Sequence, residues 1–422
     1  MKTKKKLIFS LTLALALCVG VIFAATLSMS AEDATVTASG TCGAGVTWTL
    51  TSDGTLTITG TGEMEDYYFG APWISYGNSI TSVVIESGTT SIGEYAFYYY
   101  THLTSVTIPD SVTTIGYSAF RDCTRLTNIT IPDSVTSIGE YAFTNTAYDK
   151  DEGNWDDGVL YIDNWLIEAD GEVVLGEYTI KSGTVGIADY AFSDCKSLTS
   201  VTIPDSVTTI GGRAFDNCTS LTSITIPDSV TTIGGRAFLG CTNLTSVTIG
   251  DGVTTIAASL FSDRTNLTNV TLGKNVSEIG DDAFYKCTNL TEIYFRGDAP
   301  EFGDGVFYAV HATAYYPENG NWSESDFTDH GGSITWVGYD STIFDTNAEE
   351  TQVPTDDVSN NADDNDVSVD NTNSSVSSEN NSDNSSDNND DTTKSGCSSS
   401  LTAVSVIFAF VACCVCVRRK EQ

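Results

Sequence analysis

A 23-residue repeat fills the middle of this 422-residue chain and limits what the chain can fold into. The segment LTSVTIPDSVTTIG begins at Leu103 and returns almost unchanged from Leu198 and from Leu221. A fixed period of this length is typical of solenoids, in which each repeat forms one coil and stacks on its neighbours. The spacing of phenylalanines predicts about nine coils, marked by Phe97, Phe120, Phe143, Phe192, Phe215, Phe238, Phe261, Phe284 and Phe307.

Each coil can be interpreted from its residue types. In residues 105–108, Ser and Thr alternate with Val106 and Ile108, which is the two-residue period of a strand with one buried face. The Pro-Asp-Ser segment at 109–111 predicts a turn, because proline presets φ and the two polar side chains bond nearby backbone amides. Ala119-Phe120 is expected to pack a short helical or 3-10 turn into the core. The pattern predicts a mostly β fold with such short turns.

One complete repeat carries a family resemblance. LTSVTIPDSVTTIGGRAFDNCTS, which starts at Leu198, closely resembles the repeat of BspA-like leucine-rich-repeat proteins, a family of bacterial surface proteins. The resemblance covers Gly40 to Tyr339, and it implies surface display, adhesion and contact with a host or partner, without shared catalytic residues. It divides this region into a β-rich N-terminal cap at 32–82, a leucine-rich-repeat solenoid at 83–309 and a C-terminal cap at 310–340.

The two ends of the chain predict secretion and anchoring. Residues 1–31 combine lysines, an apolar run and small residues, as in a secretory signal peptide. Residues 401–422 contain an apolar run just long enough to span a bilayer, and the basic residues after it predict a cytoplasmic tail. The acidic, Asn-, Ser- and Asp-rich residues 341–400 predict a disordered stalk. We therefore expect a single-pass anchor with the solenoid outside the cell.

Charge and residue usage exclude several functions. The net charge of −37 and the pI near 4.1 disfavour nucleic acid and anionic lipid headgroups as partners of the folded part, whereas cationic ligands and divalent ions stay open. The three histidines are too scattered for a zinc site or a general base, and no serine stands in a Gly-x-Ser-x-Gly elbow. We predict no enzyme activity, no catalytic residue, no cofactor and no metal.

Two columns of chemically versatile residues follow the repeat. A cysteine stands three residues after many of the phenylalanines, and an aspartate recurs in the turn. Packing explains the first, because free cysteine behaves as a small hydrophobe, and turn chemistry explains the second. Disulfide or metal sites and calcium binding are the alternatives. The columns are Cys123, Cys195, Cys218, Cys241 and Cys287, and Asp110, Asp133, Asp205, Asp228 and Asp251.

The repeat is interrupted at two places. Such irregular positions would allow a partner to bind at one defined position along an otherwise repetitive surface. Phe143 and Phe192 are 49 residues apart where two coils need 46, and residues 147–177 depart from the consensus. Two apolar segments around Asp163-Asn164 predict a hairpin there. Because aromatic anchors dominate interface energies, the partner-binding candidates are Tyr98, Tyr99, Tyr100, Trp155 and Trp165. The alternative is that such rings cover the hairpin's own small core.

These observations favour a cell-surface binding or adhesion protein that displays its solenoid to an extracellular protein or glycan. The alternative is a structural surface-layer component that mainly binds copies of itself. The outward Ser and Thr residues of the strands form a further stripe, which strand propensity alone explains.

Overall fold

A computed structural model describes residues 34–68 and 70–341 of the chain. The predicted signal peptide at 1–31, the anchor at 401–422 and all but the first residue of the predicted stalk lie outside the described residues. Within 34–68 and 70–341, no helix is long and apolar enough to cross a membrane.

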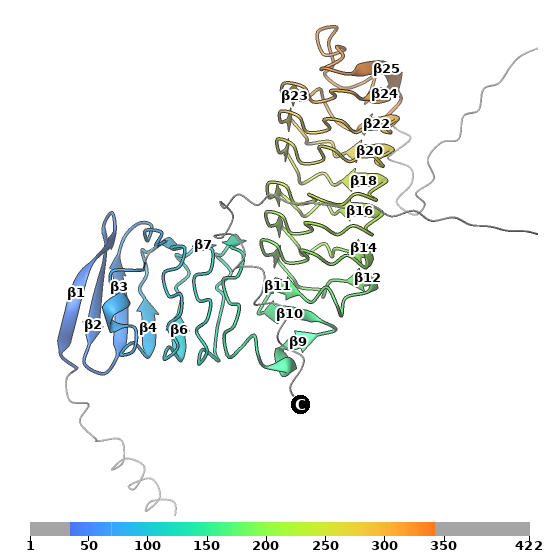
Figure 1. Cartoon of the computed structure of the whole chain (residues 1–422). Helices are drawn as coiled ribbons and strands as arrows, with labels where there is room; N and C mark the ends of the chain where they lie inside the picture. Colours follow the sequence, from blue (N-terminus) through green and yellow to red (C-terminus); the bar gives the residue numbers. More distant parts are fainter. Residues whose placement is uncertain (1–33, 69, 342–422) are drawn as a thin grey trace, which may run out of the picture. The chain divides into compact units, whose positions relative to one another are not determined.

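The described chain is a solenoid whose main parallel strands stack coil upon coil (Figure 1). Pairing follows the repeat, since Ser223 lies opposite Ser246 and Ser246 opposite Asn269. The predicted leucine-rich-repeat solenoid is therefore confirmed. Its main strands are β4 (Ser82–Ile85), β6 (Ser105–Thr107), β12 (Gly176–Thr179), β14 (Leu198–Thr202), β16 (Ser223–Ile226), β18 (Ser246–Ile249), β20 (Asn269–Leu272), β22 (Glu292–Phe295), β24 (His311–Pro317) and β25 (Ser333–Tyr339).

A second row of two-residue strands follows the turn of each coil, and these also pair in parallel. Val or Ile side chains from both rows point inward and are buried, whereas the Ser and Thr between them face outward. The short strands are β5 (Ser91–Ile92), β7 (Thr114–Ile115), β8 (Ser137–Ile138), β13 (Gly186–Ile187), β15 (Thr209–Ile210), β17 (Thr232–Ile233), β19 (Thr255–Ile256), β21 (Glu278–Ile279) and β23 (Glu301–Phe302).

The solenoid has about 12 turns, not the nine that the phenylalanines predict. Strands at both ends continue the stacking without a phenylalanine. At the N-terminal end, β3 (Thr55–Gly60) pairs in parallel with β4, and at the C-terminal end β24 and β25 extend the main sheet beyond Phe307. Two further strands, β1 (Val36–Gly43) and β2 (Val46–Thr51), pair antiparallel and close the N-terminal end.

A column of stacked phenylalanine rings forms the centre of the core. All nine repeat phenylalanines are buried, and the ring centroids of paired neighbours lie 5.2 to 5.8 Å apart. Trp73 extends the column at the N-terminal end, 5.5 Å from Phe97. The column is interrupted only where Tyr178, rather than Phe143, contacts Phe192. Each ring thus depends on its neighbours for burial, as expected for a solenoid.

The corner that carries each phenylalanine is not helical. Around Phe120, Ser118 and Asp122 have φ values of 52° and 62°, in the left-handed region, and the Phe120 N–H donates to the carbonyl of Ala142 in the next coil, at 2.8 Å. Only alternate amides bond three residues back, as from Ala119 to the Gly116 carbonyl at 3.2 Å, so the corner is a series of turns and not the short helical or 3-10 turn expected at Ala119-Phe120. Among the described residues, 3-10 helices occur elsewhere, at η1 (Ile74–Tyr76) and η2 (Glu152–Asn154).

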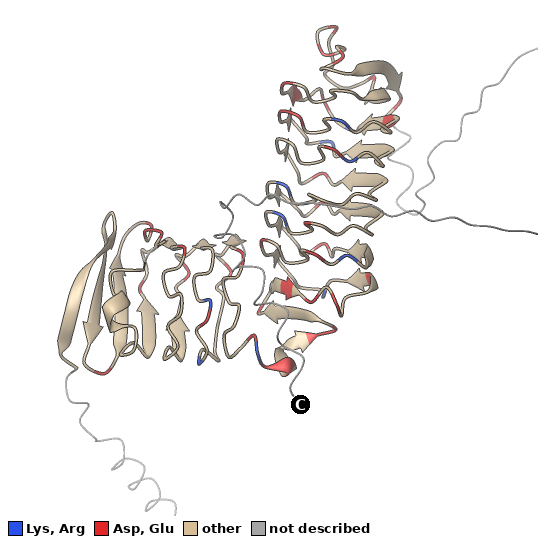
Figure 2. Ribbon diagram, in the orientation of Figure 1, with Lys and Arg blue, Asp and Glu red and all other residues tan. Residues whose placement is uncertain are grey.

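Two of the turn aspartates accept backbone N–H groups of the following coil, and charged residues occur mainly at turns of the ribbon (Figure 2). Asp228 accepts the Asp251 N–H at 2.7 Å. The Asp251 carboxylate in turn binds Lys274 at 2.9 Å and Arg296 at 3.1 Å. These cations outweigh the effect of burial and lower the pKa of Asp251. The contacts to Asp228 and Lys274 link neighbouring coils, and Arg296 comes from two repeats further along the chain, so these aspartates help to hold coils in register.

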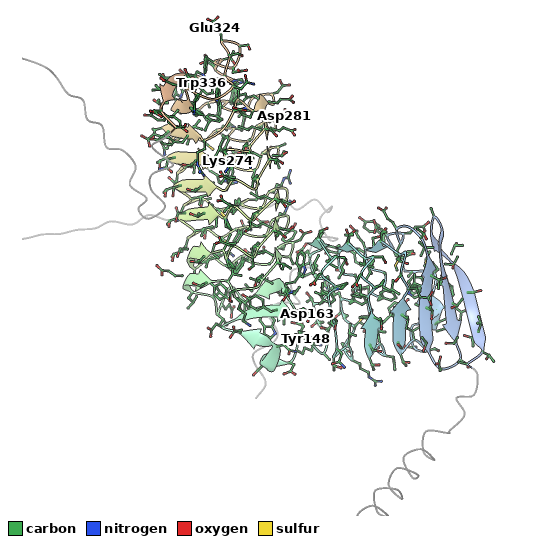
Figure 3. The ribbon with its side chains drawn as sticks, turned by 180° about the vertical axis from the view of Figure 1, so that it is seen from behind. Tyr148, Asp163, Lys274, Asp281, Glu324 and Trp336 are labelled. Atoms are coloured by element: carbon green, nitrogen blue, oxygen red, sulfur yellow. The ribbon has the colours of Figure 1, made fainter. Side chains whose placement is uncertain are left out.

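The irregular segment is a hairpin that is built into the stack. Strands β10 (Val159–Ile162) and β11 (Trp165–Ala169) pair antiparallel, with β9 (Trp155–Asp156) beside β10. On one side Asp163 accepts the Ile131 N–H at 2.7 Å, and Tyr148 donates to the carbonyl of Tyr161 at 3.1 Å; Asp163 and Tyr148 are labelled in Figure 3. On the other side β11 pairs in parallel with β13. The hairpin therefore joins the coils before and after it.

The cysteine column is buried and contains no disulfide among the described residues. The Cys218 Sγ–H donates to the carbonyl of Phe192, 26 residues earlier, with S···O of 3.1 Å, and Cys123, Cys241 and Cys287 repeat this bond. Burial raises the pKa of Cys123, Cys241 and Cys287 to about 12. The thiols are therefore protonated packing groups, as the sequence predicts.

Arg264 occupies the cysteine position in one coil, and its substitution is a test of this packing. The side chain is buried, and its Nε has no hydrogen-bond partner in the described structure. Arg264→Cys would remove this unsatisfied group and allow a thiol to reach the carbonyl of Phe238. We expect the free energy of unfolding to rise by about 1–3 kcal/mol, measured by urea denaturation. The exposed Arg125→Ala is the control and should change little; a destabilised Arg264→Cys would contradict the argument.

Candidate binding surface

The five aromatic candidates have different surroundings in the structure. Tyr98 and Tyr99 are 43% and 66% exposed. Tyr100 and Trp165 are only 4% and 2% exposed, and Trp155 is partly buried. The structure therefore brings two of the five to the surface together.

Tyr100 and Trp165 are buried because they pack into the core. Tyr100 stands at the cysteine position and packs edge-on against Phe97, with centroids 6.1 Å apart. The Trp165 indole lies against Gly186 of β13, where any Cβ would collide with the ring. Trp155 donates from Nε1 to the carbonyl of Asp149 at 2.6 Å. The hairpin tryptophans thus support the hairpin itself, which was the alternative interpretation.

Tyr98 and Tyr99 belong to a larger set of touching rings, which we call the tyrosine surface. Tyr95 is its centre, because its ring lies 5.8 Å from Tyr68, 5.8 Å from Tyr98 and 5.2 Å from Tyr117. Tyr117 in turn lies 5.8 Å from Tyr141, and Tyr98 lies 6.2 Å from Tyr99. The tyrosine surface comprises Tyr68, Tyr95, Tyr98, Tyr99, Tyr117 and Tyr141.

Four of these residues were not among the predicted contacts, although the sequence carries a signal for two of them. Tyr95 and Tyr141 both stand two residues before a repeat phenylalanine, and Tyr117 stands three before one. Positions that recur in successive coils lie side by side. Matching repeat positions thus indicate Tyr95 and Tyr141, whereas Tyr117 stands one position earlier and Tyr68 precedes the repeats.

Rings at the two ends of the tyrosine surface are exposed, and those at its centre are half-buried. Tyr68 and Tyr141 are exposed, whereas Tyr95 and Tyr117 are partly covered. Burial, together with the Tyr117 hydroxyl, raises the pKa of Tyr95 to about 12. Tyr95 is therefore neutral at physiological pH. The surface offers apolar ring faces together with hydroxyl groups.

Tyr99 holds a strained backbone without being buried. Its φ is 67°, a region that bulky residues rarely adopt. The equivalent position has positive φ in the other coils as well; six of them carry Asp, Asn or Gly, and the last two carry Lys286 and Ala309. The six are Asp122, Asn145, Asp194, Asn217, Gly240 and Asp263. The Tyr99 ring gains little from burial that could offset the strain. A strained, exposed residue is a reason to suspect function.

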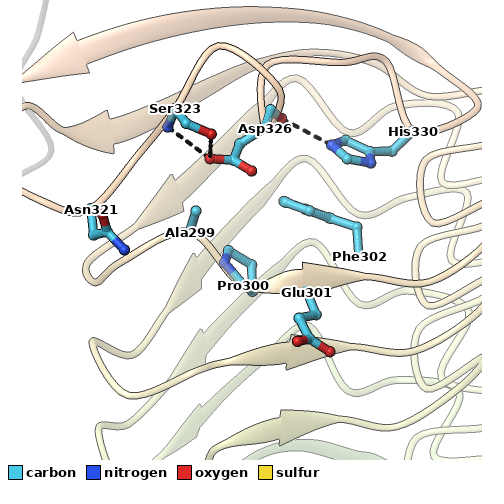
Figure 4. A pocket seen from close by; sticks show the side chains of 8 residues that line it. All are labelled: Ala299, Pro300, Glu301, Phe302, Asn321, Ser323, Asp326 and His330. Atoms are coloured by element: carbon cyan, nitrogen blue, oxygen red, sulfur yellow. Dashed lines mark hydrogen bonds between the residues drawn. The ribbon is translucent and has the colours of Figure 1, made fainter.

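A cleft near the C-terminal end is a weaker candidate (Figure 4). It is open, with a volume of about 510 Å³, and Phe302 on its wall stacks against His330 at 3.8 Å. Its polar groups hold their own loop, because Asp326 accepts the N–H and hydroxyl of Ser323, both at 2.7 Å. The lining residues are Ala299, Pro300, Glu301, Phe302, Asn321, Ser323, Asp326 and His330.

A family model described as the BspA type leucine rich repeat region matches this chain in six copies, over residues 73–151 and 185–313. The chain belongs to this family. The predicted resemblance is thereby confirmed, and the gap in the match contains the hairpin β10–β11. Three tyrosine-surface coils, those of Phe97, Phe120 and Phe143, fall within the first matched range. Membership indicates a protein-interaction role.

Solved structures of bacterial leucine-rich-repeat proteins are similar to this chain. One, from Eubacterium ventriosum, is 27% identical, with 65% of this chain and 95% of that chain covered and a TM-score of 0.33. A leucine rich cell surface protein from Faecalibacterium prausnitzii is 24% identical, with 76% and 100% covered and a TM-score of 0.24. The pneumococcal vaccine antigen PcpA is 15% identical, with 72% and 99% covered and a TM-score of 0.31. A search of curated proteins gave no match.

Proposed function

We propose that this protein is a cell-surface recognition protein that binds an extracellular partner protein through the tyrosine surface and has no catalytic role. In this proposal, residues 401–422 anchor it as a single-pass membrane protein, with the solenoid outside the cell. Family membership supports a role in protein interaction. We choose this surface because of Tyr99, whose bulky ring is held on a left-handed backbone although 66% of the residue is exposed.

The tyrosine surface has the physical properties of an interface centre. Tyrosine is enriched among hot-spot residues because its rigid ring buries a large area at a small entropic cost. Here six rings from successive coils touch, so one partner segment could contact several of them. The regular Ser and Thr face offers the same side chains in every coil and gives a partner little reason to choose one register. An irregular set of aromatic residues near one end would allow a partner to bind at one defined position along the solenoid.

Tyr99→Asn tests the proposal because it should change stability and binding in opposite directions. Asparagine tolerates the left-handed backbone better than tyrosine, so the free energy of unfolding should stay the same or rise by up to about 1 kcal/mol. Affinity for the partner should fall by about 2 kcal/mol, the range of interface hot spots. The full-length chain and the variant would be compared by capture of partners from extracellular extracts, followed by titration of the captured protein.

Tyr308→Asn is the matched control, because Tyr308 is exposed at the repeat position equivalent to Tyr98 but lies far along the chain, stacked on Tyr285. This control should capture the same partner as the unmodified chain. Equal capture by the Tyr99→Asn variant would refute the tyrosine surface as the binding site. Concentration-dependent self-assembly abolished by Tyr99→Asn would instead favour the structural surface-layer alternative.

A further inference from the structure

We propose that the tyrosine surface recognises a cationic polypeptide segment, whose arginine or lysine side chains lie over the tyrosine rings. This inference rests on the proposed function and names the chemistry of the partner. Three features support a cationic partner: the charge around the surface, two carboxylates at its edge, and cation–π pairs elsewhere in the chain.

The region that contains most of the tyrosine surface has no basic side chain of its own except His102. No Lys or Arg occurs between Lys6 and Arg121, and Figure 2 accordingly shows no blue ribbon from β1 to β6. Acidic residues are present throughout the same part of the described chain. A cationic partner would therefore be attracted to this end of the solenoid. The described acidic residues of the region are Asp53, Glu63, Glu65, Asp66, Glu86, Glu94 and Asp110.

Two carboxylates border the rings and lack a cation. Asp66 accepts the backbone N–H of Glu94 at 2.8 Å, which brings the two acidic residues together beside Tyr95. Burial raises the pKa of Glu94, and the negative charge of Asp66 raises it further. None of the ion pairs among the described residues includes either carboxylate. A partner cation placed here would relieve this repulsion.

Four tyrosine rings in the described part of the chain pair with a cation. Arg121 lies 4.8 Å from the centroid of Tyr141, at one end of the tyrosine surface. The remaining rings of the surface have no such pair within the described part of the chain. Three further pairs lie outside it: Arg213 over Tyr190, Lys181 over Tyr161 and Lys286 over Tyr285, at 5.5, 4.3 and 4.8 Å.

Cation–π attraction and the carboxylates act on the same partner group. A guanidinium over a tyrosine ring is favoured by the ring quadrupole, and arginine stacks in this way more often than lysine. An uncharged glycan could also stack on the rings, but it would make no use of Asp66 and Glu94. An acidic glycan would be repelled. The combination of rings and unpaired carboxylates therefore favours an arginine-rich segment over either glycan.

The test uses the full-length chain and a labelled dodecapeptide of alternating arginine and glycine, with binding followed by fluorescence anisotropy. A second peptide has citrulline in place of every arginine, which keeps the shape and removes the charge. We expect the arginine peptide to bind at least about tenfold more tightly than the citrulline peptide. Tyr99→Asn should weaken arginine-peptide binding about fivefold or more, and Glu94→Gln about two- to fivefold. Tyr308→Asn, the matched control, should leave it unchanged.

Two outcomes would overturn the inference. Equal affinity for both peptides would show that charge is not recognised, while the proposed function would still stand on partner capture. Equal binding of the arginine peptide by Tyr99→Asn and the unmodified chain would mean that acidic residues elsewhere in the chain, and not the tyrosine surface, bind the peptide. Failure of the proposed function itself is seen separately, as undiminished capture of the extracellular partner by Tyr99→Asn.

Discussion

Replacement of Phe215 by alanine is expected to lower the free energy of unfolding by about 3–5 kcal/mol, because it opens a ring-sized cavity in the column. Phe215 is fully buried, and its ring lies 5.2 Å from Phe192 and 5.5 Å from Phe238. Both neighbours would lose one of their stacking partners. Since solenoid coils are stabilised only through adjacent coils, the loss should be concentrated there, and hydrogen exchange during urea titration would locate it.

Phe215→Leu is the control, since it keeps most of the apolar volume and should cost clearly less than Phe215→Ala. Phe307→Ala is informative for another reason. Phe307 stacks on one repeat phenylalanine, Phe284 at 5.8 Å, and its other aromatic contacts are to Phe302 and His330. Its loss should therefore affect the C-terminal coils and leave those around Phe215 protected. A loss below about 1 kcal/mol for Phe215→Ala would be inconsistent with a tightly packed column.

The register of the solenoid could be predicted because a single period controls it. Away from the hairpin, successive consensus coils reuse the pairing of the one before, as when Thr209 lies opposite Thr232 and Ile210 opposite Ile233. The two-residue alternation also identifies the buried face. The ends could not be counted from the phenylalanines, because β3, β24 and β25 stack through backbone pairing without that marker.

The burial of individual aromatic residues was harder to predict, since it depends on the position within a coil. Tyr98, Tyr99 and Tyr100 are identical neighbours in sequence, but only Tyr100 stands three residues after its phenylalanine, where the other coils bury cysteine. That signal was available. The left-handed backbone at Tyr99 was indicated only by the Asp, Asn and Gly residues at the equivalent position of other coils, because tyrosine itself gives no indication of positive φ. Contacts between Tyr68 and the repeat tyrosines depend on how the N-terminal cap packs, which no local pattern contains.

The corner conformation could not be predicted from residue types for a related reason. Positions with positive φ carry tyrosine, serine, arginine or aspartate as well as glycine, for example at Tyr190, Arg213 and Ser259. Their conformation is imposed by hydrogen bonds to the next coil, such as that from the Arg213 N–H to the Gly235 carbonyl at 3.2 Å. Tertiary hydrogen bonds therefore override the local preference for a helical turn.

Trp165→Ala is expected to lower the free energy of unfolding by about 3–5 kcal/mol, because a buried indole is removed from the junction between the hairpin and the following coils. Trp165 pairs with Gly186 across β11 and β13, and its ring fills the space that glycine leaves. The same substitution should not change the affinity of the folded protein for its partner, since only 2% of Trp165 is exposed. Urea denaturation and partner titration would be measured on the same variant.

Trp155→Ala separates the two roles that the hairpin tryptophans could have. Trp155 is partly buried and makes one hydrogen bond to the Asp149 carbonyl, so its removal should cost less than that of Trp165, about 1–2 kcal/mol. If the hairpin only joins two parts of the stack, neither variant will lose affinity while it remains folded. Because Tyr99→Asn is expected to do the reverse, weakening binding without loss of stability, the three variants together assign each ring to packing or recognition. A Trp165→Ala protein that stayed fully stable and lost its partner would place recognition at the hairpin and contradict the tyrosine surface.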